Sequence, residues 1–273
     1  MDGAPAYGIL DGDRVRAADD SFTRRYADLR AVLDAGVLAE LPQRCTGRPL
    51  PQASIRFLPT IPNPDKVICV GVNYRPHVEE MGRDIPEHPV LFVRFAASQV
   101  GHLECLLKPA ASEQFDFEGE LAVVIGRRAR HVSRDDAWSF IAGVTCFMDG
   151  SVRDWQRHTM QFTAGKNFLR SGSMGPWLAT PDELPEPEDI KLETRVNGSV
   201  MQKGRLTDLI FPIPELIEYC STFAELLPGD VIATGTPGGV GAARKPPVWL
   251  GDGDRVEIDI AGVGTLINPV CAE

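Results

Sequence analysis

The chain has 273 residues, enough for one large domain or for one domain with a small appendage. Hydrophobic residues make up 43% and charged residues 24%, which is ordinary for a globular protein that buries a core. The formal charge is -10, and no cluster of Lys and Arg interrupts it. No nucleic-acid partner is therefore expected, because such a partner requires a basic face on the protein.

The sequence also predicts a compartment. No apolar run approaches the ~18 residues of a membrane helix, and the first residues lack the basic and apolar regions of a signal peptide. The six cysteines lie far apart without a C-x-x-C pair, and Cys69 and Cys146 sit in apolar runs typical of buried free thiols. We therefore expect a cytoplasmic protein with no membrane partner, no disulfide framework and no zinc site.

The first 62 residues predict a small α+β unit. Residues 7–17 carry two apolar arms around Asp-Gly-Asp, the pattern of a short hairpin. Residues 26–41 place apolar side chains at helical spacing. The segment 48–65 contains five prolines, which favours an extended connection. We place a boundary near residue 62, between an N-terminal unit (1–62) and a main domain (63–273).

The main domain is predicted to be rich in strands. One short helix is expected before the strand that ends at Asp149, and a longer helix over 212–226 with prolines in its first turn. The predicted strands and hairpins cover residues 66–74, 89–95, 120–126, 141–149, 191–204, 230–234 and 254–270. This mixture of many strands with few helices indicates an α+β fold.

Three acidic residues form the sharpest local pattern. Glu118 and Glu120 alternate along an apolar segment, so their side chains share one face of a strand. Neighbouring carboxylates that lose hydration repel each other, and a hard cation such as Mg²⁺ or Mn²⁺ resolves the repulsion. Asp149, at the end of another apolar strand, would supply a third carboxylate ligand to the same cation. The competing interpretation is an edge strand with both glutamates in water.

Polar neighbours of this pattern have their own expected roles. Asp116 shares the glutamates' face and is a candidate for a position just outside the metal ligands. Asp154 is expected to form a structural salt bridge with its neighbour Arg153. In the glycine-rich segment 234–241, the spacing is not that of a phosphate-binding loop. A turn whose backbone amides and Thr236 hydroxyl face a carboxylate fits it better.

Seven blocks of sequence, in order from Lys66 to Val270, resemble the fumarylacetoacetate hydrolase superfamily. They are VGVNYRPHVEEMG, FDFEGELAVVIG, GVTCFMDGSVRDWQ, GKNF, LIFPIPELIEY, GDVIATGTPGGVG and GVGTLINPV. The resemblance implies a strand-rich, mixed β-sandwich or roll catalytic fold, usually a homodimer. It also implies Mg²⁺, Mn²⁺ or Ca²⁺ held by the residues that match its E-x-E and following Asp, which are Glu118, Glu120 and Asp149.

The resemblance also suggests roles around the metal. His77 and Glu80 match a dyad in which Glu80 orients His77 to activate water, although a surface His–Glu pair would have the same spacing. Lys166 matches a lysine beside the metal that stabilises an enolate; the alternative is an ordinary surface lysine. Arg153 and Gln156 match residues that bind substrate oxygens.

These roles predict a metal-dependent hydrolase that cleaves a C–C bond in a 2,4-dioxo acid resembling an acylpyruvate. The alternatives are an oxaloacetate-type decarboxylase, a 2-oxo acid hydratase or isomerase of the same superfamily, and a relative that binds without catalysis. In each case the partner is a small anionic 2-oxo acid. Where relatives often carry Lys-Pro after the second strand, this chain has Arg94-Phe95.

Overall fold

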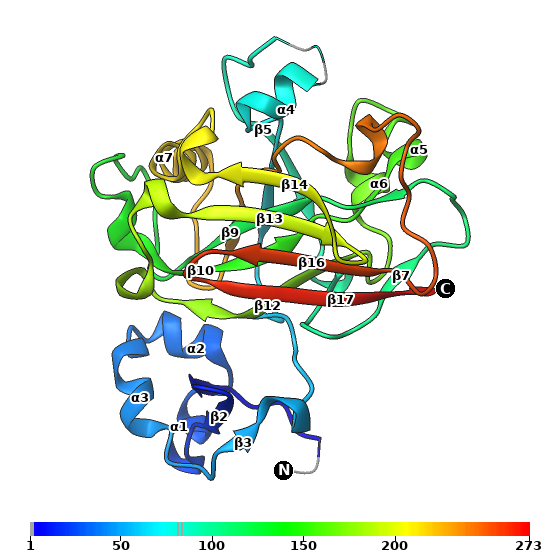
Figure 1. Ribbon diagram of the computed structural model, residues 1–273. Helices are drawn as coiled ribbons and strands as arrows, with labels where there is room; N and C mark the ends of the chain where they lie inside the picture. Colours follow the sequence, from blue (N-terminus) through cyan, green and yellow to red (C-terminus); the bar gives the residue numbers. More distant parts are fainter. Residues whose placement is uncertain (1–2, 81, 83) are drawn as a thin grey trace.

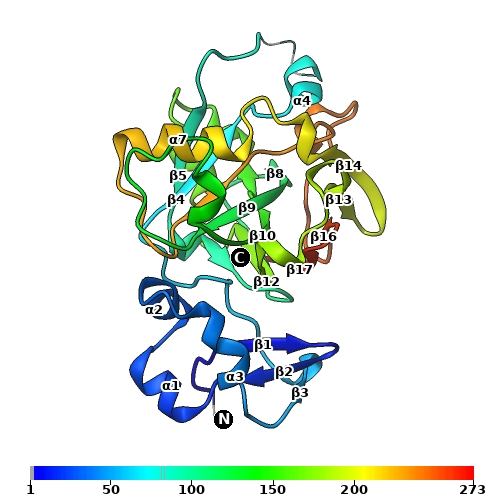
Figure 2. The same cartoon turned by 90° about the vertical axis from the view of Figure 1, so that its left-hand side faces the viewer.

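The computed structural model describes residues 3–80, 82 and 84–273, without the side chain of His77. Two groups of elements lie at opposite ends of the molecule in both views (Figures 1 and 2). The first elements of the chain form one end, and α4 (Arg75–Glu80) lies at the other. Two larger sheets fill the space between them.

The N-terminal elements form a three-stranded sheet with short helices beside it. These are β1 (Gly8–Asp11), β2 (Arg14–Ala17), β3 (Leu50–Pro51), α1 (Asp20–Arg25), α2 (Leu29–Asp34) and α3 (Leu41–Arg44). The predicted hairpin is confirmed by the antiparallel pairing of β1 with β2. Asp19 and Asp28 begin α1 and α2 because their carboxylates accept hydrogen bonds from first-turn amides.

The connection to the main domain differs in part from the expected extended segment. Leu50 and Pro51 pair with β2, so the start of the proline-rich stretch belongs to the N-terminal sheet. Residues 55–66 then run to β4 without a helix or strand. The boundary near residue 62 falls in this stretch and stays a prediction.

The main domain contains two sheets and a short strand pair. The larger sheet has the order β5 (Val90–Arg94), β4 (Val67–Gly71), β15 (Val231–Ala233), β9 (Gly119–Ile125), β10 (Ile141–Met148), β12 (Gly172–Ala179) and β6 (Gln99–Val100). The smaller has the order β14 (Ser199–Arg205), β13 (Lys191–Val196), β16 (Arg255–Ile260), β17 (Gly264–Ala272) and β7 (Leu106–Lys108). The pair is β11 (Ser151–Val152) with β8 (Phe115–Asp116).

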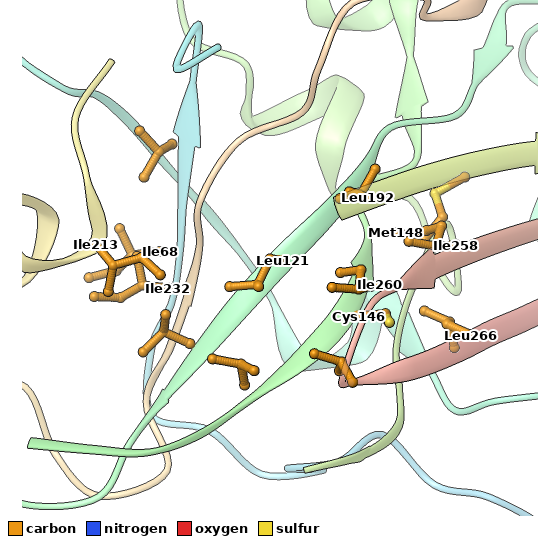
Figure 3. Close-up of a cluster of buried hydrophobic side chains, with 14 of the residues drawn as sticks. Ile68, Leu121, Cys146, Met148, Leu192, Ile213, Ile232, Ile258, Ile260 and Leu266 are labelled. Atoms are coloured by element: carbon orange, nitrogen blue, oxygen red, sulfur yellow. The ribbon is translucent and has the colours of Figure 1, made fainter. Parts of the chain in front are cut away.

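The core lies between the two sheets. Leu121, Cys146 and Met148 of the larger sheet pack against Ile258 and Leu266 of the smaller one (Figure 3). The opposite face of β9, with Ala122 and Val124, belongs to a second buried cluster. Because both faces of β9 are covered, its sequence is continuously apolar after Glu120.

The remaining helices cover the sheet edges and the loops. α7 (Ile213–Phe223) packs Ile213 beside Ile68 and Ile232 (Figure 3). Short helices α5 (Arg153–Gln156) and α6 (Thr163–Lys166) follow β11. Single 3-10 turns are η1 (Leu38–Glu40), η2 (Gln52–Ser54), η3 (Ala96–Ser98), η4 (Ala137–Phe140), η5 (Pro181–Glu183), η6 (Pro187–Asp189), η7 (Leu206–Asp208) and η8 (Gly241–Ala243).

The Asn-Gly hairpin illustrates a local pattern that predicted its structure. Asn197 and Gly198 join β13 to β14 with φ angles of 51° and 77°. Both angles lie in the left-handed region, which Asn and Gly adopt more readily than other residues. The predicted helix over 212–226 and the hairpin near the C-terminus are likewise present as α7 and β16–β17.

The expectation about disulfides is wrong for one pair. Cys105 is bonded to Cys271, with their Cα atoms 5.7 Å apart. These cysteines are 166 positions apart, and only the parallel pairing of β7 with β17 brings them together. The other four cysteines of the described chain are buried and unpaired. Within the described residues, no helix is both long enough and apolar enough to cross a membrane.

Candidate metal and substrate site

The three acidic residues of the sequence pattern meet where β9 begins and β10 ends. The two strands are antiparallel, with Gly119 opposite Met148, so Glu118 and Asp149 extend from adjacent strand ends. The amide of Asp149 donates to the carbonyl of Glu118 over 2.9 Å, which fixes the two backbones. One carboxylate oxygen from each of Glu118, Glu120 and Asp149 lies within 4.8 Å of the others.

These carboxylates are buried. Glu118 is 7% exposed, Glu120 2% and Asp149 0%. The interpretation of an edge strand with both glutamates in water is wrong, because β9 lies between β15 and β10. Grouping carboxylates away from water is unfavourable unless positive charge or protons compensate them.

Lys166 supplies one compensating charge from α6. Its Nζ lies 2.7 Å from Glu118 Oε2 and 2.5 Å from Asp149 Oδ2. On another side, the same Nζ lies 4.9 Å from the ring centroid of Phe92, a favourable position for a cation. The side chain is 2% exposed, so the interpretation of Lys166 as a surface lysine is wrong.

Arg153 supplies a second charge from the start of α5. Its Nη2 lies 2.6 Å from Glu118 Oε1, and its Nε donates to Asp116 Oδ2 over 2.8 Å. Its Nη1 donates to the side-chain oxygen of Gln156 over 2.9 Å. Arg153 is thus joined to Gln156 and to the outer carboxylate of Asp116, next to the acidic cluster.

The expected salt bridge between Asp154 and Arg153 is wrong. Asp154 instead accepts a hydrogen bond from the Ser112 hydroxyl over 2.7 Å. Successive residues of a helix point in different directions, so the start of α5 turns Arg153 inward and Asp154 towards Ser112. Asp116 is instead the acidic partner of Arg153. Its carboxylate also accepts hydrogen bonds from the backbone amides of Gly241 and Ala242.

Arg94 supplies a third charge that the sequence did not assign to the site. It ends β5 with its side chain fully buried, and its Nη1 lies 2.6 Å from Asp149 Oδ1. A signal was available, because an arginine at the end of an apolar strand needs an acidic partner when it is buried. The partner itself, on a strand four positions away across the sheet, has no local signature.

The glycine-rich loop after β15 holds the start of β9. The amide of Gly235 donates to Glu120 Oε2 over 2.9 Å, and the hydroxyl of Thr236 donates to the Gly119 carbonyl over 2.9 Å. Gln202 in turn donates to the Thr236 hydroxyl over 2.8 Å. Thr236 therefore contacts the backbone of Gly119, the residue between Glu118 and Glu120 in the sequence. Its binding of a substrate carboxylate stays a prediction.

The predicted dyad lies on α4. The Glu80 carboxylate accepts from the amide of Gly239, with the nearer oxygen at 3.0 Å, so the end of α4 contacts the glycine-rich loop. The side chain of His77 lies outside the described part of the chain. The pairing of His77 with Glu80 and its catalytic role stay predictions.

The cluster has one more carboxylate than it has cationic side chains among the described residues. Four carboxylates (Asp116, Glu118, Glu120 and Asp149) face three cationic side chains (Arg94, Arg153 and Lys166) among the described residues. Burial, with Asp149 and Glu118 nearby, raises the pKa of Glu120 well above its ordinary value. Burial opposes the charge of Lys166, but Asp149 and Glu118 outweigh it and raise the pKa of that ammonium.

A divalent cation fits this donor set. Carboxylate oxygens are hard ligands of the kind that Mg²⁺, Mn²⁺ and Ca²⁺ prefer. Glu120 has only the Gly235 amide as a direct donor and no ion pair of its own among the described contacts. A cation bound by Glu118, Glu120 and Asp149 would offset that excess charge.

Two surface hollows lie elsewhere. One, of about 310 Å³, is lined by residues such as Arg30, Asp34 and Arg128, between α2 and the main domain. The other, of about 260 Å³, is lined by residues such as Arg56 and Arg170. Neither is lined by a carboxylate of the cluster, so we do not assign the substrate to either.

The fold and the cluster define a strand-rich α+β protein with a buried acidic triad suited to a divalent cation. A family model described as fumarylacetoacetate (FAA) hydrolase C-terminal matches residues 66–271. The chain therefore belongs to the fumarylacetoacetate hydrolase family, an enzyme family, and the resemblance drawn from the sequence is confirmed.

Similar proteins come from distant organisms. The mitochondrial oxaloacetate tautomerase FAHD2A of Bos taurus is 43% identical over 223 residues, covering 81% of this chain and 71% of that protein. Oxaloacetate tautomerase YisK of Bacillus subtilis is 43% identical over 222 residues, covering 80% and 74%. The solved structure of fumarylacetoacetate hydrolase from Exiguobacterium antarcticum is 33% identical, with a TM-score of 0.88, covering 100% and 97%. That similarity confirms the predicted fold class.

Proposed function

We propose that this chain catalyses keto–enol tautomerisation of a small anionic 2-oxo dicarboxylic acid of the oxaloacetate type. Mg²⁺ or Mn²⁺ would be held by Glu118, Glu120 and Asp149. The observation that carries the proposal is the buried carboxylate cluster around the Lys166 ammonium. The relatives named oxaloacetate tautomerase support the substrate class and favour the isomerase alternative over C–C hydrolysis.

The reaction moves one proton. A C–H bond at C3 of the 2-oxo acid breaks, an O–H bond forms at the C2 oxygen, and no water or oxidant is consumed. A bound divalent cation would supply a Lewis acid that favours the negative charge developing on the C2 oxygen. The protein's own groups then have two tasks, which are to stabilise that oxygen and to carry the proton.

Lys166 is suited to the first task. Its ammonium is buried and held charged by Glu118 and Asp149, so it can donate a hydrogen bond to an oxyanion in a site of low polarity. Arg153 and Gln156, which are bonded to each other beside the cluster, are proposed to bind substrate carboxylate oxygens. Their mutual hydrogen bond fixes the direction of the guanidinium.

The second task requires a group that accepts the C3 proton and returns it. We do not assign this task to Lys166, because its Nζ lies between Glu118 and Asp149, and these carboxylates favour the charged ammonium, which cannot accept a proton. We propose His77, oriented by Glu80, for this role. Glu80 itself is anchored by the Gly239 amide, so it ties α4 to the loop that also contacts Glu120.

The proposal is tested by following the ultraviolet absorbance of enol-oxaloacetate as it ketonises in the presence of Mg²⁺ or Mn²⁺. We expect acceleration by the protein, loss of that acceleration with a chelator, and loss in Glu118→Gln. Glu113→Gln is the matched control, because Glu113 is 86% exposed and pairs only with Lys108 in the described structure. Unchanged ketonisation with the purified protein would contradict the proposal.

Hydrolysis of an acylpyruvate is the second candidate. It is favoured by the close structural similarity to the fumarylacetoacetate hydrolase of Exiguobacterium antarcticum. Acetylpyruvate cleavage, measured as pyruvate with lactate dehydrogenase, separates the two: cleavage without tautomerisation would assign the hydrolase. The same coupled assay with oxaloacetate reports decarboxylation. The predicted homodimer is checked separately by light scattering.

A further inference from the structure

Gln202 brings a polar side chain into the core from β14, a strand whose other residues are exposed or half-buried. The side chain lies in the interior, and the residue is only 1% exposed. A buried amide is unfavourable unless hydrogen bonds replace the water that it loses. The position of Gln202 therefore directs attention to the groups that its amide binds.

The Gln202 amide joins β9 to the loop that follows β15. Its Oε1 accepts from the Gly119 amide over 2.9 Å. Its Nε2 donates to the Thr236 hydroxyl over 2.8 Å and to the Pro237 carbonyl over 2.8 Å. The Thr236 hydroxyl donates in turn to the Gly119 carbonyl. Gln202 thus holds both backbone groups of Gly119, one directly and the other through Thr236.

The backbone of Gly119 lies beyond the point where β15 ends. The register of β15 on β9 stops with Ala233 opposite Ala122, whereas Gly119 is opposite Met148 on the other neighbouring strand, β10. Within the described structure, no strand pairs with Gly119 on the side of β15. A buried backbone N–H without an acceptor is unfavourable, and Gln202 supplies the acceptor that a strand would otherwise provide.

Gly119 also lets the smaller sheet approach β9 closely. A Cβ atom at this position would overlap Oγ1 of Thr194 on β13. Thr194 is opposite Gln202 in the ladder between β13 and β14, so a larger residue at position 119 would push both away. The Thr194 hydroxyl has no hydrogen-bond partner among the described residues, so it does not share the task of Gln202.

We propose that Gln202 is a positioning residue that fixes the backbone between Glu118 and Glu120 and so sets the separation of their carboxylates for a divalent cation. The Asp149 amide holds the Glu118 carbonyl, and the Gly235 amide holds the Glu120 carboxylate. Gln202 fixes the residue between them and the loop that carries Gly235. The inference rests on the metal site proposed above, but it assigns a role to a residue of the smaller sheet that acts through the backbone.

Gln202→Met is the direct test, because it nearly keeps the length and volume of the side chain and removes its hydrogen bonds. Chelator-treated protein is titrated with Mn²⁺, and electron paramagnetic resonance of the free ion gives the dissociation constant. We expect this constant to rise about 10-fold, at the lower end of the range for residues that orient metal ligands. Urea unfolding of the same metal-free proteins measures stability separately.

Asn268→Leu is the matched control. Asn268 is also a 1% exposed amide of the smaller sheet, on β17. It accepts from the Ser173 hydroxyl and donates to the carbonyls of Gly101 and Glu104. These partners belong neither to the acidic triad nor to the loop after β15. We expect Asn268→Leu to lower the urea midpoint about as much as Gln202→Met does, and to leave the Mn²⁺ dissociation constant unchanged.

Gln202→Asn is a milder second variant. It keeps the amide but is one methylene shorter, so it cannot reach Gly119 and the loop together. We expect a smaller rise of the Mn²⁺ dissociation constant than in Gln202→Met. This variant carries the test if Gln202→Met does not fold.

The comparison of affinity with stability decides the outcome. Weaker Mn²⁺ binding in the Gln202 variants, but not in Asn268→Leu, supports the positioning role. An unchanged constant in the Gln202 variants, or an equal rise in Asn268→Leu, would mean that Gln202 only supports the fold. Either result would overturn the inference and leave the metal site intact.

The measurement also separates this inference from the proposed function. Because no substrate is present, the result does not depend on whether the chain tautomerises oxaloacetate. An unmodified protein that binds no Mn²⁺ would overturn the metal site and this inference together.

Discussion

Charged side chains lie in two contrasting regions of this protein. At the ends of β9 and β10, Glu118 and Asp149 both contact Lys166 of α6, with almost no exposure to water. On the outer face of α7, Arg134 pairs with Glu215 at 3.0 Å and with Glu218 at 2.6 Å, and its side chain is 56% exposed. The distances are similar in the two regions, but the surroundings differ.

The difference shows that distance alone does not determine what a charge pair contributes. A buried charge that loses its partner has no water to replace it, so removal of one member destabilises the fold strongly. An exposed charge that loses its partner is hydrated at once, and dissolved ions already screen it. Charge pairs at similar distances can therefore contribute strongly to stability in a buried site and very little at the protein surface.

Removing Lys166 should give the largest effect. In Lys166→Met, two buried carboxylates lose a cation, and we expect metal-free protein to lose about 3–5 kcal/mol of unfolding free energy, measured in urea. Tautomerisation should slow by about 100- to 1,000-fold, because the donor to the developing oxyanion is gone. A variant as stable and as active as the unmodified protein would show that the ammonium has neither role.

Metal removal should have the next largest effect. An ion that binds only the folded protein at a concentration one hundred times its dissociation constant adds about 2.7 kcal/mol of stability. We therefore expect a chelator to lower the urea midpoint of the unmodified protein and to leave that of Glu120→Gln nearly unchanged. An equal response in both proteins would place the ion somewhere other than the acidic triad.

The local sequence predicted the acidic triad because its members lie next to strand ends. Glu118 and Glu120 stand two positions apart, so their spacing pointed to a shared strand face, with an edge strand in water as the competing interpretation. Asp149 was added because it closes another apolar run. Lys166 and Arg153 were found through the resemblance to a family. Arg94 was missed because its partner, Asp149, follows a strand that lies four positions away in the sheet. The sequence of a short segment does not show which distant strand it will lie near.

The same limit applies to the fold. Runs of β-branched residues predicted β4, β9 and β10, but β12 was missed, because Gly175 and Pro176 interrupt its apolar sequence. That strand forms a ladder with β10 only through a register shift near Cys146. Such an irregularity is stable because tertiary packing on both faces of the sheet compensates for a poor local preference.

His102 offers a test of a buried group that remains neutral, with a smaller expected effect. Burial lowers the pKa of His102 to about 4, and its Nδ1 accepts from the Ile267 amide. In the unfolded chain its pKa is near the ordinary value of about 6.5. Because the folded-state pKa is depressed, this stabilisation is present above about pH 6.5 and is lost as the pH falls towards 4.

Replacing His102 by Asn keeps an acceptor for Ile267 and removes the titration. We expect the unmodified protein to lose about 1–3 kcal/mol more than His102→Asn between pH 7.5 and pH 4.5, measured by urea unfolding at both values. The exposed His158 is the control, since His158→Gln should follow the unmodified protein. Parallel pH profiles for His102→Asn and the unmodified protein would contradict the assignment.

Arg134→Met should have the smallest effect and completes the comparison of the two regions. Glu215 and Glu218 would lose a partner that is more than half exposed, and water would replace it. We expect a shift of the urea midpoint below about one tenth of that for Lys166→Met, and smaller still in 1 M salt. A shift as large as that of Lys166→Met, persisting in salt, would mean that burial does not separate the two regions. The contrast between buried and exposed pairs would then have to be explained by their different numbers of hydrogen bonds.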